Sequence, residues 1–285
     1  MIDARALLRR EKLAAKKGFG QNFLIDAMVT RSIAEACVPD SEMGRAVVVE
    51  LGAGLGALTS LLLERAAHVV AVERDRDLVP ILAQELEPDV TAGKLTIAEA
   101  DAQTFDIESA FAAATLAGAP RVLCGNLPYQ ITGRLLQRAV EHAAHLDRAV
   151  FMVQREVADR LLAEPGSKEY GGLTIFTRAA FDVTRVRNVS PGCFHPAPDV
   201  TSSVVRLVPC RPARAIENET FRALVKRAFE ARRKTLRNAW SSLGPERVAV
   251  AAEQVGIALD RRGETLDVLE YAKMAAALDA LPAPA

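Results

Sequence analysis

The chain has 285 residues, half of them hydrophobic, and its 36 basic and 36 acidic side chains give no net charge. A chain of this length can bury a full core and corresponds to one large domain with a smaller one. The longest uncharged apolar run, residues 51–63, is far shorter than a membrane span of roughly 20 residues. The charged N-terminus is unlike a signal peptide, and the four cysteines lack the spacing of zinc ligands. We expect a cytoplasmic protein with no membrane contact and no metal, and we expect a monomer.

Positive charge gathers in two parts of the chain. Residues 1–20 form a basic N-terminal extension with six Lys or Arg residues against two acidic ones. Residues 206–237 carry ten basic residues against three acidic ones. A single cluster of this kind is more often a solvated helix face than a phosphate-binding surface, and a second cluster in the same chain brings the two interpretations closer together.

Residues 46–155 alternate between short runs rich in Val, Leu and Ile and longer segments rich in Ala and Leu. This alternation is typical of βαβ units and predicts a parallel sheet covered by helices. The predicted strands are 46–51, 68–73, 95–98, 121–125 and 148–154, and the predicted helices are 57–65, 76–86, 107–116 and 132–145.

The chain changes character after residue 183. Two β-rich runs within 183–208, joined by a Pro-rich stretch, predict an antiparallel pair at the sheet edge. Helical spacing follows, and the predicted helices are 218–239, 245–255 and 265–278. We therefore predict an α/β fold, with a Rossmann-like, mostly parallel sheet and an antiparallel edge strand in residues 1–209, followed by a small α-helical domain in residues 210–285.

A glycine-rich turn follows the first predicted strand of the sheet. Gly52, Gly54 and Gly56 lie between this strand and a helix, where glycine lets a ligand approach the backbone. Glu73 ends the next strand, where a carboxylate can accept both ribose hydroxyl protons. These features predict a nucleoside cofactor, and they suit NAD and S-adenosylmethionine (SAM) equally.

Polar residues also follow the third and fourth predicted strands. Asp101 comes after the third strand, where a short acceptor can bind an adenine amino group, although the same residue can equally cap the next helix. The tetrapeptide Asn126-Leu127-Pro128-Tyr129 comes after the fourth strand. Ligands of doubly wound sheets bind along this edge, so we expect the tetrapeptide to face the cofactor.

The segment from Asn126 to Tyr129 suits methyl transfer to an adenine amino group. The lone pair of that nitrogen is delocalised into the ring, so catalysis must favour a pyramidal amine aligned with the methyl group. The side-chain oxygen of Asn126 and the carbonyl of Leu127 can accept the two amino protons, Pro128 stiffens the turn, and Tyr129 can stack on the base. No ionised base is required, and the segment favours SAM over NAD.

With these motifs, residues 16 to near 275 resemble the ribosomal small-subunit adenine dimethyltransferase family, the 16S rRNA dimethyladenosine transferases. The sequence KKGFGQNFL at 16–24 looks like the family's N-terminal motif, which implies that Asn22 and Leu24 contact SAM. The resemblance also implies that Gly52 lines the methionine end of SAM, Glu73 holds its ribose, Asp101 meets its adenine, and Asn126 borders both the cofactor and the target base.

Two later segments carry the same resemblance. Residues 190–202 are similar to a segment whose Phe packs near the target adenine, so Phe194 is a second stacking candidate. Residues 230–238 resemble the family's basic helix, which implies phosphate contacts by Arg232, Arg233, Lys234 and Arg237. Gln130 stands where the family often has Asn, and Ala53 where Pro is common, but neither departure touches an assigned group.

The resemblance implies SAM-dependent dimethylation of two adjacent adenosines near the 3′ end of 16S rRNA, with the immature 30S subunit as partner. A macrolide-resistance enzyme, which methylates a large-subunit adenine, shares the Asn-x-Pro-Tyr core, but the sequence at 232–238 argues against it. A noncatalytic ribosome-assembly or transcription factor on the same fold is a further alternative, which the intact Asn126 and Tyr129 oppose. A nicotinamide dehydrogenase would need a hydride-transfer motif that we do not find.

Overall fold

The computed structural model describes residues 2–114, 116–230 and 232–282. The chain forms two compact units. The sheet unit comprises the residues up to Ala158 together with Val183–Pro209, and the helical unit comprises Asp159–Asp182 together with the residues from Cys210 onward. The segment 159–182 therefore belongs with the helices that follow residue 210, whereas the predicted boundary assigned it to the sheet domain.

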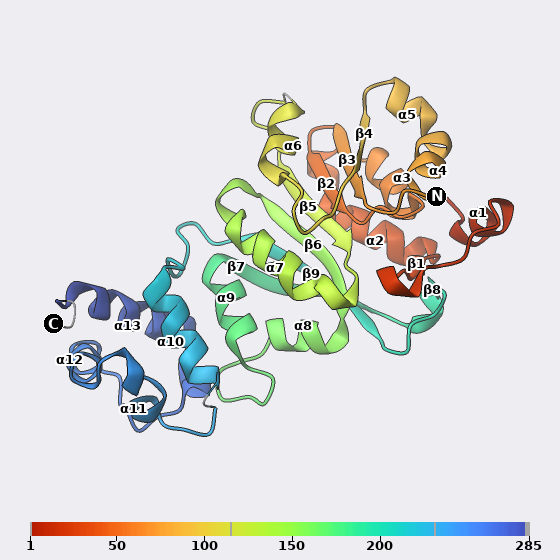
Figure 1. Cartoon of the computed structure of the whole chain (residues 1–285). Helices are drawn as coiled ribbons and strands as arrows, with labels where there is room; N and C mark the ends of the chain where they lie inside the picture. The colour runs from red at the N-terminus through yellow and green to blue at the C-terminus, as the bar shows by residue number, and fades with distance from the viewer. Residues whose placement is uncertain (1, 115, 231, 283–285) are drawn as a thin grey trace. The chain divides into compact units, whose positions relative to one another are not determined.

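Among the described residues, seven strands form a mixed sheet in the order β4, β3, β2, β5, β6, β9, β7 (Figure 1). The strands are β2 (Val47–Leu51), β3 (His68–Glu73), β4 (Leu95–Glu99), β5 (Arg121–Asn126), β6 (Arg148–Gln154), β7 (Phe181–Val189) and β9 (Ser202–Pro209). Strands β2 to β6 pair in parallel, and β9 pairs antiparallel with β6. The predicted mostly parallel sheet with an antiparallel edge is confirmed.

The central strands are apolar over most of their length because helices cover both faces of the sheet. All five residues of β2 are buried, and successive side chains of a strand point to opposite faces. Val48 packs in one cluster with residues of α2 (Ala27–Cys37) and α3 (Ala57–Leu63). On the other face lie α6 (Ile107–Ala113) and α7 (Thr132–Glu141) (Figure 1).

Aspartate side chains fix the beginnings of several helices. Asp26 accepts a hydrogen bond from the backbone N–H of Val29 at the start of α2, and Asp106 accepts one from Ser109 at the start of α6. The remaining helices are α1 (Ala4–Arg10), α4 (Val79–Glu85), α5 (Glu87–Thr91), α8 (Arg155–Leu161), α9 (Gly172–Ala180), α10 (Glu219–Glu230), α11 (Leu236–Ala239), α12 (Pro245–Val255) and α13 (Val268–Ala280). Within the described ranges, no helix has the length and apolar character that crossing a membrane requires.

A separate two-stranded sheet joins the N-terminal region to the Pro-rich loop that follows β7. Its strands, β1 (Phe23–Leu24) and β8 (Phe194–His195), pair antiparallel, with Leu24 opposite Phe194. The backbone N–H of Ile25 extends the pairing by donating to the carbonyl oxygen of Cys193 at 2.9 Å. Residues near the start of the chain are thereby held beside a segment far along the sequence.

The helical unit has its own aromatic core. Trp240 is fully buried, its ring packs edge-on against Tyr271, and its indole N–H donates to the carbonyl oxygen of Leu224 at 2.9 Å. Tyr170 and Ile175 belong to the same cluster. These two buried side chains explain why the segment 159–182 is part of the helical unit, although it precedes the last strands of the sheet.

The predicted helix 218–239 is wrong in its middle part. Helix α10 ends at Glu230, residues 232–234 form a turn, and α11 begins at Leu236. The backbone N–H of Leu236 donates to the carbonyl oxygen of Arg261 at 2.8 Å rather than to the preceding turn of a helix. Tertiary hydrogen bonds of this kind override a helical spacing of apolar residues.

Candidate active site

A cavity lies at the carboxyl ends of β2, β3 and β5, where the strand order reverses. Ligands of open α/β sheets bind at such a reversal. Its walls come from the N-terminal segment, the glycine-rich turn, the residues after β3 and β4, and the turn after β5. The cavity brings together these predicted site residues: Asn22, Leu24, Gly52, Glu73, Asp101, Asn126, Leu127 and Tyr129.

The glycine-rich turn forms the floor of the cavity. Gly52, Gly54 and Gly56 have φ angles of +81°, +57° and +83°, which side chains rarely tolerate. A Cβ atom at Gly54 would lie 3.3 Å from the ring of Phe23. A Cβ atom at Gly52 would meet only the carbonyl oxygen of Asn126 among the described residues, at 3.9 Å, so the space beside Gly52 is open to a ligand.

Glu73 is held rigidly at the end of β3. Its side chain accepts hydrogen bonds from the backbone N–H groups of Gly54 and Asp75, each at 2.8 Å, and the residue is 7% exposed. Burial raises the pKa of Glu73, and the backbone hydrogen bonds offset part of this effect. Each carboxylate oxygen has a second lone pair, with which it can accept a hydrogen bond from a ribose hydroxyl group.

Glu50 is a second buried carboxyl group on the cavity wall, and sequence reasoning missed it. It lies in β2, is 2% exposed, and accepts a hydrogen bond from the Thr59 hydroxyl at 2.6 Å. The pKa of Glu50 is raised to about 8, chiefly by burial; the Thr59 hydrogen bond opposes this shift, and the charge of Glu73 adds to it. The signal in the sequence was an acidic residue in an otherwise apolar buried strand.

Asp101 forms one side of the cavity together with Arg74 and Phe19. The backbone N–H of Gln103 donates to one oxygen of Asp101 at 2.9 Å, and the Arg74 guanidinium lies 3.4 Å from the other oxygen. The same guanidinium lies 4.7 Å from the centroid of the Phe19 ring. A carboxylate, a cation and an aromatic ring therefore occupy one wall, and together they suit a planar heterocycle that carries an amino group.

Asn126 ends β5, and its amide has a defined orientation. The side-chain nitrogen donates to the backbone carbonyl oxygen of Asn22 at 3.0 Å, so the side-chain oxygen is the atom left to accept a hydrogen bond from a ligand. Gly125 lets β5 approach β2 at this point, because a Cβ atom there would lie 2.4 Å from the carbonyl oxygen of Leu51. Sequence reasoning did not assign a role to Gly125.

The turn after β5 holds Leu127 and Tyr129 at the cavity. The backbone N–H of Leu127 donates to the carbonyl oxygen of Met152 at 3.1 Å, which fixes the chain as it leaves the sheet. The phenol oxygen of Tyr129 lies 2.9 Å from the hydroxyl oxygen of Ser202, a fully buried residue of β9. This hydrogen bond fixes the edge of the half-buried ring.

Phe194 does not reach the cavity. Its side chain is 2% exposed and packs in the core cluster of the sheet unit with residues such as Leu24 and Val29. Pairing between β1 and β8 turns this ring into the core. The structure therefore gives no support to Phe194 as a stacking residue, and the role that it supports is packing beneath β1.

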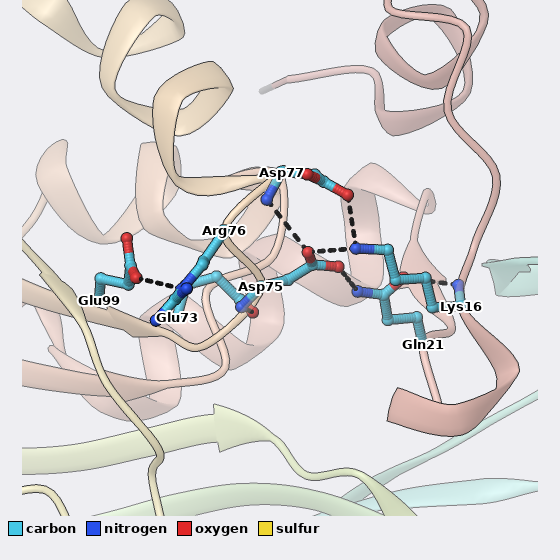
Figure 2. Close-up of polar contacts among 7 residues, drawn as sticks. All are labelled: Lys16, Gln21, Glu73, Asp75, Arg76, Asp77 and Glu99. Carbon is cyan, nitrogen blue, oxygen red and sulfur yellow. Dashed lines mark hydrogen bonds and ion pairs between the residues drawn. The ribbon is translucent and has the colours of Figure 1, made fainter.

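Residues 16–24, which we call the N-terminal strap, form one wall of the cavity. Figure 2 shows Lys16 and Gln21 of the strap directed at Asp75, two residues after Glu73. The Lys16 ammonium lies 2.6 Å from Asp75 and 2.6 Å from Asp77, and the Gln21 amide nitrogen donates to Asp75 at 2.7 Å. Burial by itself raises the pKa of Asp75, but the hydrogen bonds from Lys16 and Gln21 outweigh it and hold this pKa below its ordinary value.

The four predicted phosphate-binding residues differ in their surroundings. All four are exposed in the helical unit, but Arg232 has close partners. Arg232 forms an ion pair with Glu264 at 2.8 Å and donates to the carbonyl oxygens of residues 167 and 168. Arg232 therefore holds the turn after α10, and the other three are better placed for contact with a ligand.

The donor set of the cavity fits an adenosine-bearing cofactor and gives no sign of a metal centre. The carboxylates of Glu73 and Asp101, the open space beside Gly52, and the apolar side chains of Leu24 and Leu51 match the polar and apolar parts of such a ligand. In the part of the chain that the structure describes, no group of three or more His, Cys, Asp or Glu side chains is arranged to hold a metal ion.

Comparison with known proteins gives a consistent result. The family model for ribosomal RNA adenine dimethylases matches residues 12–280. A ribosomal RNA small subunit methyltransferase A from Anaeromyxobacter sp. (strain K) is 46% identical over 279 residues, which is 95% of each chain. The fold is similar to the crystal structure of a dimethyladenosine transferase from Plasmodium falciparum, with a TM-score of 0.72, 23% identity, and coverage of 88% of this chain and 95% of the other. It is also similar to the 23S rRNA methyltransferase ErmE, with a TM-score of 0.66, 23% identity, and coverage of 90% and 100%.

Proposed function

Because this chain belongs to the ribosomal RNA adenine dimethylase family, we propose that it dimethylates two adjacent adenosines near the 3′ end of 16S rRNA within the immature 30S subunit. The protein is a SAM-dependent rRNA adenine dimethyltransferase whose substrate is small-subunit rRNA. The proposal includes the position of the two adenosines and the assembly state of the particle. It also includes a monomeric enzyme that acts in the cytoplasm, where ribosomes assemble.

The observation that carries the proposal is the orientation of Asn126 in the cavity that also holds Glu73. The Asn126 nitrogen is engaged by the Asn22 carbonyl, so its oxygen is available to a proton of the target amine. The Leu127 carbonyl provides a second acceptor on the next residue, and Tyr129 provides a ring on the same turn. An adenine amino group has two protons, and a pair of acceptors matches them.

Each group on the cavity wall then has a defined task. Bound SAM supplies a methyl group on a positively charged sulfur atom. Glu73 would hold the ribose of SAM, and Asp101 would bind its adenine amino group. Asn22 and Leu24 would form part of the wall of the cofactor site. Asn126 and Leu127 would accept hydrogen bonds from the target amine and favour its pyramidal form, while Tyr129 stacks on the base and keeps the amine in line with the methyl group.

The exposed charges of the helical unit support a role in RNA binding. Arg233, Lys234 and Arg237 lie close together in the sequence, and their side chains are exposed. Arg and Lys side chains neutralise phosphates and release counterions, which gives affinity without sequence preference. We include these three residues among the RNA contacts of the proposed function and leave Arg232 as a structural residue.

Methylation of undermethylated small subunits with labelled SAM tests the proposal. Asn126→Ala should lose dimethylation, on the order of 10²-fold or more in kcat, because the positioned acceptor is gone. Its SAM affinity should change much less, and Gln254→Ala, at an exposed glutamine of α12 in the helical unit, should behave as the unaltered protein. Unchanged dimethylation by Asn126→Ala would rule out the catalytic assignment. When both ribosomal subunits are offered as substrates, label in 23S rather than 16S rRNA would favour the large-subunit alternative.

A further inference from the structure

We propose that Asp75 is a positioning residue for methyl transfer, which anchors the N-terminal strap at the cofactor cavity and, through Asn22, sets the orientation of the Asn126 amide. This inference rests on the proposed function, because it concerns the same cavity. It gives a task to three residues, Lys16, Gln21 and Asp75, that lie outside the predicted site.

Asp75 has the properties of an anchor rather than of a surface charge. Its side chain is 2% exposed, and both oxygens are engaged. One oxygen accepts from the Lys16 ammonium and from the backbone N–H of Asp77, and the other accepts from the Gln21 amide (Figure 2). A buried carboxylate needs such partners, and loss of any of them leaves a charge without compensation.

Gln21 links the anchor to the backbone of the strap itself. Its amide oxygen accepts a hydrogen bond from the backbone N–H of Lys16 at 2.8 Å, while its amide nitrogen donates to Asp75 (Figure 2). The segment between Lys16 and Gln21 is therefore closed into a loop and attached at both ends to the same carboxylate. This segment includes Phe19, which lines the cavity.

The next residue after Gln21 makes the contact with the catalytic amide. The Asn22 carbonyl accepts from the Asn126 nitrogen at 3.0 Å, and β1 begins one residue later. Between the Asp75 anchor and the pairing of β1 with β8, the strap has little freedom to move its Asn22 carbonyl. If the anchor is lost, the Asn126 amide loses the partner that distinguishes its nitrogen from its oxygen.

Asp75 lies in the same turn as Glu73, the proposed ribose-binding carboxylate. The backbone N–H of Asp75 donates to Glu73 at 2.8 Å, so the two carboxylates are fixed relative to each other. The position of the strap and the position of Glu73 therefore depend on one short turn after β3. Removal of the Asp75 charge should affect cofactor affinity as well as the rate of transfer at saturating cofactor.

The variants Asp75→Asn and Lys16→Met test this role in the full-length protein. Each should weaken SAM binding about tenfold or more, measured by calorimetry, because a hydrogen bond between charged groups is lost. Each should also lower kcat at saturating SAM, since Asn126 is no longer held. Lys16→Arg keeps the charge and should restore most of both, and the double variant should lose little more than either single variant.

A readout that does not require methyl transfer is amide hydrogen exchange in residues 16–24. In the unaltered protein these amides should exchange slowly, and more slowly still with SAM. In Asp75→Asn they should exchange faster, and SAM should restore protection only in part. Glu42→Gln is a matched control, because Glu42 forms a part-buried ion pair with Arg148 away from the cavity; it should lower thermal stability without changing SAM affinity or exchange in the strap.

The outcomes separate the anchor from the proposed function. The proposed role of Asp75 is overturned if residues 16–24 exchange at the same rate in Asp75→Asn and in the unaltered protein. It is also overturned if Asp75→Asn loses thermal stability while its SAM affinity and kcat are unchanged. If the unaltered protein binds SAM but methylates no small-subunit rRNA, the proposed function fails. The exchange measurement still decides whether Asp75 holds the strap in that case.

Discussion

The buried carboxyl group of Glu50 should make the stability of the sheet unit depend on pH in an unusual direction. In the folded protein its pKa is about 8, against an ordinary value of 4.5. Between these two values the folded state keeps a proton that the unfolded chain has lost, so stability is fully present below about pH 4.5 and falls as the pH rises towards 8. Most buried carboxylates with ion partners act in the opposite sense.

The size of the effect follows from the width of this window. Each pH unit inside it lowers the free energy of unfolding by about 1.4 kcal/mol, so the full decrease is about 5 kcal/mol. The decrease from about pH 5.5 to 7.5 is about 3 kcal/mol. Glu50→Gln removes the titration and keeps the shape, because the Thr59 hydroxyl can donate to the amide oxygen instead. The variant should therefore lose much less stability over the same interval.

Urea unfolding of the two proteins at several pH values measures the difference. Far-UV circular dichroism reports on both units, whereas fluorescence of Trp240 reports on the helical unit alone. Burial also raises the pKa of Glu73, but Glu73 is present in both proteins, so the difference between their curves isolates Glu50. Glu35→Gln, at an exposed position of α2, should reproduce the unaltered curve. Parallel pH curves for Glu50→Gln and the unaltered protein would refute the reasoning.

Three further predictions concern Gly125 and the basic residues Arg232 and Arg233. Gly125→Ala places a Cβ atom 2.4 Å from the Leu51 carbonyl oxygen. This contact should cost about 1–3 kcal/mol in stability and lower kcat on the order of 10²-fold, because it displaces Asn126, the next residue. Gly133→Ala, with open space around it, should leave activity unchanged. Arg232→Ala should destabilise the helical unit by about 1–3 kcal/mol through the loss of its hydrogen bonds, and an unchanged melting temperature would contradict this role. Arg233→Glu should leave stability unchanged and reduce the salt dependence of RNA binding by about one phosphate contact. An unchanged slope of RNA affinity against salt concentration would contradict the assignment of Arg233.

The sheet could be predicted closely because its central strands are mostly apolar runs. The predicted strands 68–73 and 148–154 coincide with β3 and β6, and the others differ by a residue at one end. Helix α2 was missed, although Asp26 at its start and the spacing of its apolar residues are helix signals. The predicted helix 76–86 begins later in the structure, where Pro80 occupies the first turn of α4.

The cavity was predictable as a set of residues but not as a set of contacts. Every predicted cofactor residue lines it, because the ends of parallel strands meet at one edge. The hydrogen bond from Asn126 to the Asn22 carbonyl joins residues 104 positions apart, and the Asp75 anchor joins residues 59 positions apart. Neither leaves a local pattern in the chain, and the same is true of the packing that takes Phe194 into the core.

The pairing of β1 with β8 has a consequence for the biosynthesis of this protein. A chain folds progressively as it leaves the ribosome, N-terminal parts first. The strap emerges before the sheet, yet its strand partner, Phe194–His195, follows about 170 residues later in the chain. Strands β2 to β6 can pair before then, whereas the wall formed by the strap must wait. A nascent chain should therefore acquire its sheet well before it acquires a closed cofactor site.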